Sequence, residues 1–162
     1  MKWKDLIENW GMTSLKLKAI FLETEWKPTD SDKDAAWDLY VELLTRIAIQ
    51  PLAVQDGIEK AALESIYSLF QTTRTILKVR GRQCVEFTKL AVVVLNQIVR
   101  PFTARWHRIS IEGGFDDPEV RKHFRHELEC LQKQLITYAK ALAYIAGVED
   151  LTELSYTAYC GQ

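Results

Sequence analysis

Seven large apolar residues near the C-terminal end of this chain recur at spacings of four and three positions. They are Phe124, Leu128, Leu131, Leu135, Tyr138, Leu142 and Ile145. Residues spaced in this way share one face of an α-helix, and three successive heptads are typical of a helix in a bundle or a coiled coil. Asp116 or Asp117 caps the helix, Pro118 stands in its first turn and Gly147 ends it. We therefore expect a helix over residues 117–147, about 45 Å long, whose apolar seam packs against other helices.

The most apolar stretch of the chain, from Cys84 to His107, predicts a helix with two buried sides. One apolar stripe consists of Val85, Thr88, Val92, Leu95, Val99 and Phe102, and a second of Phe87, Ala91, Val94 and Ile98. A helix that contacts neighbours on two sides lies near the middle of a bundle. Pro101 disturbs it, because proline lacks a backbone donor and clashes with the preceding turn. Either the helix kinks there, or it ends and a new turn starts at Pro101.

Two further helices are expected over residues 32–50 and 58–80. The first follows the capping residues Asp30–Asp32 and ends before Pro51. Its expected core stripe is Trp37, Tyr40, Leu44 and Ile47. The second has a full stripe of Ala62, Ile66, Leu69, Thr73 and Ile76. Gly81 ends it so close to the helix over 82–108 that the two must form an antiparallel hairpin. Together the four helices predict an all-α protein, an antiparallel four-helix bundle.

The first 27 residues are rich in tryptophan and are expected to pack on this bundle. Trp3–Trp10 predicts a short helix, since its apolar residues share one face. Residues 14–26 fit a helix, although Leu15–Lys18 alternates like a strand. We favour the helix, because Ser155–Tyr159 is the only other strand-like segment.

Length and composition indicate one domain over residues 1–162, with an N-terminal packing segment (1–27), a four-helix core (32–147) and a tail (148–162). Apolar residues make up 48% and charged residues 27%, which is ordinary for a folded domain. No apolar run approaches the roughly 20 residues of a membrane span, and no signal sequence is evident. We therefore expect a cytoplasmic protein without a membrane partner. The three cysteines form no CxxC pair and are expected to be reduced thiols.

Charge is unevenly distributed along the chain. Residues 1–71 carry a net charge of −4, residues 72–126 carry +6 and residues 127–162 carry −3. The blocks either neutralise one another across the bundle, or the basic middle binds an anionic partner such as RNA, a nucleotide or an acidic protein face. The candidate anion-binding residues are Arg80, Arg82, Arg105 and Arg108.

No metal site or cofactor is expected. His123 and Glu127 are one turn apart on a helix, as are His126 and Cys130, but the two pairs lie on different sides. The Glu-x-x-His pattern of di-iron bundles is absent, as are phosphate-binding glycine loops and a serine nucleophile elbow.

Arg100 and His107 form the one local constellation with possible catalytic chemistry. Seven positions apart, they fall on nearly the same face of a continuous helix. An arginine that binds phosphate and a histidine that transfers protons are what metal-free RNA cleavage requires. The pattern resembles that of HEPN-type ribonucleases, helical bundles in which an arginine precedes a histidine by four to six intervening residues and a dimer completes the site. Arg121 and His126 match the same spacing, whereas the polar residue that usually follows the arginine is replaced by Pro101 or Lys122.

These observations favour a non-catalytic helical interaction or accessory module that associates with itself or with another helical protein. The enzymatic alternative is a HEPN-like, metal-independent ribonuclease that uses Arg100 and His107. A third alternative is a sensor that binds an anion or a nucleotide at the basic middle of the chain.

Overall fold

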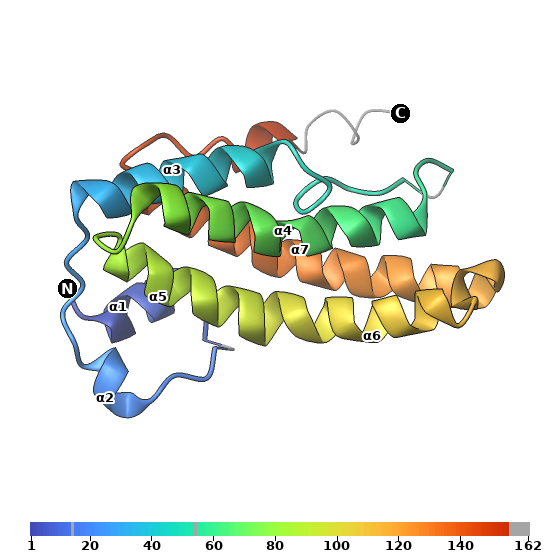
Figure 1. Ribbon diagram of the computed structural model, residues 1–162, viewed down its shortest axis with the longest axis horizontal. Helices are drawn as coiled ribbons and strands as arrows, with labels where there is room; N and C mark the ends of the chain where they lie inside the picture. The colour runs from blue at the N-terminus through green and yellow to red at the C-terminus, as the bar shows by residue number, and fades with distance from the viewer. Residues whose placement is uncertain (14, 54, 156–162) are drawn as a thin grey trace.

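The protein is a bundle of long antiparallel helices. The computed structural model describes residues 1–155 with the exception of residues 14 and 54; residues 156–162, including most of the strand-like segment 155–159 and Cys160, lie outside the described residues. The long helices are α3 (Asp30–Leu44), α4 (Glu59–Arg80), α5 (Val85–Val94), α6 (Arg100–Ile111) and α7 (Pro118–Ala146). Successive long segments run in opposite directions, with α5 and α6 forming one of them (Figure 1). No strand occurs among the described residues, only a bridge between Lys2 and Glu25. The predicted all-α class is confirmed.

The helix seam predicted from heptads is the centre of the core. All seven seam residues from Phe124 to Ile145 are buried. The predicted stripe of α4 is buried as well. The predicted ranges 58–80, 82–108 and 117–147 match the observed helices within three residues at each end, because glycine and the helix caps mark those ends locally.

The predicted range 32–50 is wrong at its C-terminal end, because α3 stops at Leu44. The amide of Gln132, on α7, donates hydrogen bonds to the carbonyls of Ile47 and Gln50, at 2.8 and 2.5 Å. The segment after α3 is irregular, and its backbone carbonyls accept these bonds from Gln132. In a longer helix, backbone N–H groups of the helix itself would have bonded to such carbonyls. The side chain of Thr45 donates back to the carbonyl of Val41, which also favours a helix end.

The expected core position of Trp37 is also wrong, since this residue is 46% exposed. The buried face of α3 instead contains Ala35, Ala36, Leu39, Tyr40 and Leu43. Two adjacent alanines let the backbone of α3 approach its neighbours closely, and the bulky indole is left on the outside.

A π-helical segment, Leu95–Val99, joins α5 to α6 without a break. The predicted end of the helix at Pro101 is not observed, because the π segment continues directly into α6. The backbone N–H of Arg100 bonds to the carbonyl of Leu95, five residues back. This wider turn directly precedes Pro101, which has no N–H to donate and whose ring would crowd the turn before it.

The extra residue of the π turn changes which apolar stripe is buried. Before it, the second predicted stripe is buried, as at Phe87 and Val94; after it, the first stripe is buried, as at Val99 and Phe102. The step from Val94 to Val99 is five residues rather than four. The two predicted stripes therefore form a single buried face, and the unused half of the first stripe, which includes Val85 and Val92, is about half exposed.

The N-terminal segment packs against one end of the bundle, as expected. Helix α1 (Trp3–Asn9) agrees with the prediction, but within the described residues 15–26 only α2 (Ala19–Leu22) is helical. The predicted helix is wrong because the backbone of Lys16 pairs with a side chain: Gln97 accepts from its N–H at 2.7 Å and donates to its carbonyl at 2.8 Å. An extended segment held by a side chain from far away in the sequence leaves no periodic signal.

Three tryptophans anchor this segment. Trp3 is buried and donates to Glu86 on α5 at 2.9 Å. Trp26 packs edge-on against both Trp3 and Trp10, and Trp10 contacts Tyr144 of α7.

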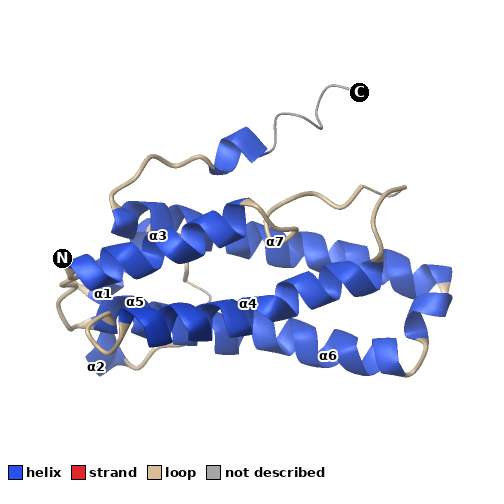
Figure 2. Cartoon of the chain, turned by 45° about the horizontal axis from the view of Figure 1, so that its top comes forward, coloured by secondary structure: helices blue, strands red, loops and turns tan. Residues whose placement is uncertain are grey.

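After α7 the chain crosses the outer side of α3 (Figure 2). The hydroxyl of Tyr40 donates to the carbonyl of Glu149 and accepts from the N–H of Leu151. A short 3-10 helix, Thr152–Ser155, follows. Among the described residues, no helix combines the length and the apolar character that a membrane crossing requires.

Candidate functional site

The four predicted anion-binding arginines do not form one site. Arg80 is paired with Asp38 at 2.8 Å, and Arg108 with Glu112 at 3.2 Å. Arg105 is paired with Glu127 at 2.5 Å. Arg82, at the turn between α4 and α5, forms no ion pair within the described ranges. In Figure 1 this turn lies at one end of the bundle, whereas α6 extends to the other. Three of the four charges are therefore neutralised locally, and the set is split between two regions.

Arg100 and His107 both lie against α4. The guanidinium of Arg100 lies over the ring of Phe70, 4.6 Å from its centroid, and donates to Asn96 at 3.0 Å. His107 packs edge-on against Tyr67, with 4.7 Å between ring centroids, and its Nε2 lies 3.4 Å from Glu64. The two residues thus share one side of the helix, as their spacing predicts.

His123, on α7, belongs to a different contact. His123 Nε2 lies 3.2 Å from Glu127, whose other oxygen accepts from the buried indole of Trp106 at 2.7 Å. Glu127 is therefore occupied by Arg105, Trp106 and His123. The described residues contain no group of three metal-ligating side chains.

An open apolar groove of about 720 Å³ lies between the segment around α2 and the outer face of α5. We refer to it as the α2–α5 groove. One wall carries Leu17, Ile20 and Phe21, and the other Val85, Val92 and Val93. Ile20 is 79% exposed, which is unusual for so large an apolar side chain beside other exposed apolar residues.

The groove exists because of two features of the fold. The π turn leaves Val85 and Val92 outside the core, as described above. Gln97 holds the backbone of Lys16 beside α5, so that the chain from Lys16 to α2 forms a second wall. In Figure 1, α2 lies below α1, at the end of the bundle where α5 begins.

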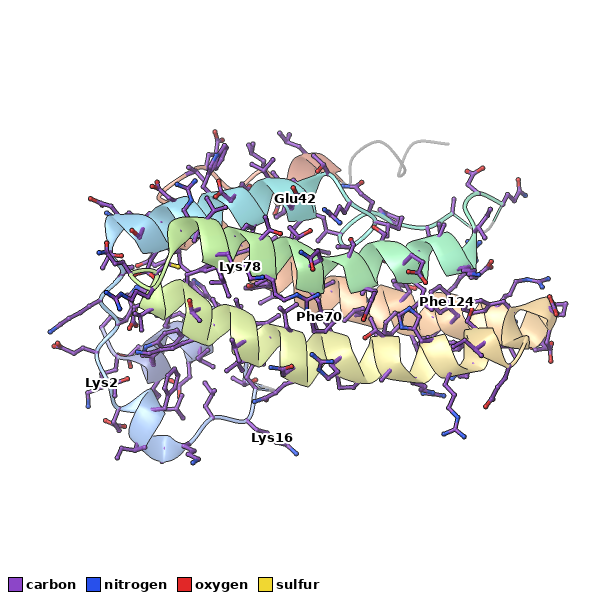
Figure 3. All side chains as sticks on the ribbon, in the orientation of Figure 1. Lys2, Lys16, Glu42, Phe70, Lys78 and Phe124 are labelled. Carbon is purple, nitrogen blue, oxygen red and sulfur yellow. The ribbon has the colours of Figure 1, made fainter. Side chains whose placement is uncertain are left out.

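The border of the groove is positively charged. Lys16, Lys18, Arg82 and Lys89 line it, and no carboxylate does. Lys89 also pairs with Glu86 at 2.8 Å and lies 5.7 Å from the centroid of Phe21. Lys16 stands at the outer edge of the N-terminal segment in Figure 3. The groove therefore combines an apolar floor with a cationic border.

The sequence contained two signals for this groove. Leu15–Lys18 alternates apolar and basic residues, and the central helix has more apolar stripes than one core face needs. Neither signal places the two segments side by side, so the groove was not predicted.

Comparison of the chain with protein-family models, with curated proteins and with solved structures finds no match.

Proposed function

We propose that this protein is a non-catalytic interaction module that binds an acidic amphipathic helix of a partner protein in the α2–α5 groove. The observation that carries the proposal is the exposed apolar floor whose lining residues include four cations, of which Lys89 is paired with Glu86, and no carboxylate. An amphipathic helix that lays its apolar face into a groove is a recurring mode of peptide recognition.

The dimensions of the groove suit such a ligand. Along α5 and the π segment it extends from Val85 to Gln97, about 18 Å at 1.5 Å per residue. That length corresponds to roughly three turns of a bound helix. The groove is open along its length, so it fits a protein segment better than an enclosed small molecule.

Charge selects the partner. Acidic residues beside the apolar stripe of the ligand would lie near Lys16, Lys18 and Arg82, which raises the rate of association and excludes basic helices. We accordingly expect binding to weaken as the salt concentration rises.

The test is a selection from a displayed library of helical peptides on the full-length protein. Enriched peptides are expected to carry apolar residues at helical spacing with acidic flanks. Ile20→Glu is expected to weaken their binding by about 2 kcal/mol, or roughly thirty-fold in Kd, because it removes a side chain that the ligand would bury.

The matched control is Ile111→Glu, which places the same change at an apolar residue that is 87% exposed on α6, far from the groove. This variant is expected to bind the peptides as the unchanged protein does. A selection that yields no acidic amphipathic peptide, or binding that survives Ile20→Glu, contradicts the proposal. Self-association by light scattering that Ile20→Glu abolishes would identify a second copy of the chain as the occupant and overturn the proposed partner.

We also propose a second candidate function, metal-independent RNA cleavage by Arg100 and His107. It is supported by the placement of both side chains on the side of α6 that faces α4. The measurement is cleavage of a labelled RNA by the unchanged protein and by His107→Ala, with His126→Ala as the control at an exposed histidine of α7. Cleavage that persists in His107→Ala removes this residue from the mechanism, and loss of cleavage in His126→Ala instead implicates the other Arg–His pair.

A further inference from the structure

A second candidate surface runs along the contact between α4 and the α5–α6 segment. Tyr67, Gln71 and Arg74 lie on one face of α4, because their spacings are four and three residues. Arg100 and His107 contact α4 from the other segment, and Asn96 accepts a hydrogen bond from Arg100. We refer to these six residues as the α4–α6 strip. Phe70 lies between the two segments, and Lys78 continues the same face of α4 beyond Arg74 (Figure 3).

Aromatic and cation–π contacts join the strip into one surface. Arg100 lies over Phe70, the ring of Tyr67 is 5.7 Å from that of Phe70, and His107 contacts Tyr67 at 4.7 Å. Arg74 is one helical turn from Phe70. The two arginines are therefore held near the same aromatic residue, on opposite helices.

These arginines differ from Arg80, Arg105 and Arg108 in their partners. Arg74 donates to the amide oxygen of Gln71, at 3.2 and 3.4 Å, and Arg100 donates through Nε to the amide oxygen of Asn96. An amide orients a guanidinium without neutralising it, and for Arg100 it leaves both terminal nitrogens available as donors.

The charge that remains is positive. Within the part of the chain that the structure describes, neither arginine has a carboxylate partner, and Lys78 has none either. Arg80, Arg105 and Arg108 are all ion-paired, as described above. At the far end of the strip, Glu64 supplies a negative charge, which His107 faces.

Tyr67 provides an aromatic platform beside these cations. It is 46% exposed, and its ring is nearly perpendicular to that of His107 and tilted by 50° relative to that of Phe70. Surfaces that bind single-stranded nucleic acid typically combine exposed aromatic rings with cations. An unpaired base stacks on the ring, and the cations bind the phosphate groups.

We infer that the α4–α6 strip binds single-stranded nucleic acid, with phosphodiester groups on Arg74 and Arg100 and a base on Tyr67. The distance along α4 from Tyr67 to Lys78 is about 17 Å, enough for roughly five stacked nucleotides at 3.4 Å each. This binding is separate from the groove and does not require catalysis.

The experiment measures the anisotropy of a labelled 12-nucleotide RNA, with DNA of the same sequence and the corresponding duplex in parallel arms. The variants are Arg74→Gln, the double variant Arg74→Gln/Arg100→Gln, and Tyr67→Ala. The control is Arg108→Gln/Lys122→Gln, which removes the same charge from exposed positions on α6 and α7.

The single strands are expected to bind more tightly than the duplex. The double variant is expected to lower the slope of log K against log salt by about 1.4, because each lost phosphate contact contributes about 0.7. Tyr67→Ala is expected to weaken binding roughly ten-fold at fixed salt, whereas the control variant keeps the slope. Equal affinities for the RNA and for the DNA of the same sequence would indicate that the protein recognises phosphate and base but not the sugar, as proposed.

Three results would overturn the inference. They are the absence of binding at low salt, tighter binding of the duplex, and a control variant that loses as much affinity as Arg74→Gln/Arg100→Gln. Arg74 is exposed, so the single variant Arg74→Gln keeps the test decisive even if Arg100→Gln unfolds the protein.

Discussion

Among the residues in the first turns of the helices, Asp32 is the one whose replacement by alanine should destabilise the protein most. Asp32 lies in the first turn of α3 and is fully buried. It accepts hydrogen bonds from the backbone N–H and the hydroxyl of Thr29, the N-cap residue, at 2.7 and 3.0 Å. Its other oxygen accepts from the N–H of Phe87, in the first turn of α5, at 2.9 Å.

One carboxylate therefore caps two helices. Cys84, the N-cap residue of α5, makes no capping hydrogen bond with its side chain, so Asp32 supplies from α3 the acceptor that α5 lacks. The N-terminal ends of both helices also favour its negative charge.

The expected loss follows from these bonds. A capping side chain contributes about 1 kcal/mol per helix, and each buried N–H left without an acceptor costs about 1–3 kcal/mol. With the N–H groups of Thr29 and Phe87 both affected, and Thr29 partly accessible to water, Asp32→Ala should cost about 3 kcal/mol. For a chain of this size the melting temperature would fall by roughly 6–12 °C.

Urea unfolding followed by far-UV circular dichroism measures this free energy. Asp30→Ala is the matched control, because Asp30 is an acidic residue in the same turn whose side chain is 96% exposed and pairs only with Lys33 in the described structure. It should change the stability by less than about 0.5 kcal/mol. If Asp32→Ala and Asp30→Ala have the same effect, the double-capping argument is refuted.

Three further changes test the packing. Tyr138→Phe should leave the free energy of unfolding in urea unchanged or raise it by up to about 1 kcal/mol. The reason is that the buried hydroxyl has no hydrogen-bond partner among the described residues, and burial raises the pKa of Tyr138. A loss of stability would instead indicate a hydrogen-bond partner for this hydroxyl. Gly114→Ala should lower the melting temperature, since its Cβ would lie 2.8 Å from the carbonyl oxygen of Ile109; an unchanged melting temperature contradicts that contact. Arg125→Met should cost about 2–3 kcal/mol, because Arg125 donates to Glu59 at 2.9 Å and to carbonyls of the segment before α4. Burial opposes ionisation of Glu59, but Arg125 outweighs it and holds the pKa of this carboxyl below its usual 4.5. The resulting stability is present above about pH 4.5 and is lost as the pH falls through the lowered pKa, so urea unfolding from pH 6 to pH 3 should be less pH-dependent in Arg125→Met.

The sequence predicted helix positions better than it predicted surfaces. The ends of α4 and α7 were correct because Gly81, Pro118 and Gly147 act within one or two turns. The predicted C-terminal end of α3 was wrong because Gln132, more than 80 residues away, binds the backbone of the segment that follows the helix.

The candidate sites show the same division. The shared face of Arg100 and His107 followed from helical periodicity alone, and the structure places both against α4. The groove did not follow from any local pattern, because its walls are joined by the hydrogen bonds between Gln97 and Lys16. The local sequence was equally unable to predict which arginines are paired with a carboxylate. Charge counts cannot distinguish Arg80, which is paired with Asp38, from Arg74, which is not paired with a carboxylate in the described structure.

By itself, the sequence determined that the chain is helical, where its long helices lie and which seam of α7 is buried. These properties depend on the spacing of apolar residues and on caps within a few positions, and both can be seen in a linear sequence. Only the tertiary structure decided which stripe of the central helix is buried, because the π turn before Pro101 shifts the helical register by one residue. The same shift leaves Val85 and Val92 outside the core. The exposed α5 wall of the proposed binding groove thus arises from a single turn, and its other wall depends on the hydrogen bonds between Gln97 and Lys16.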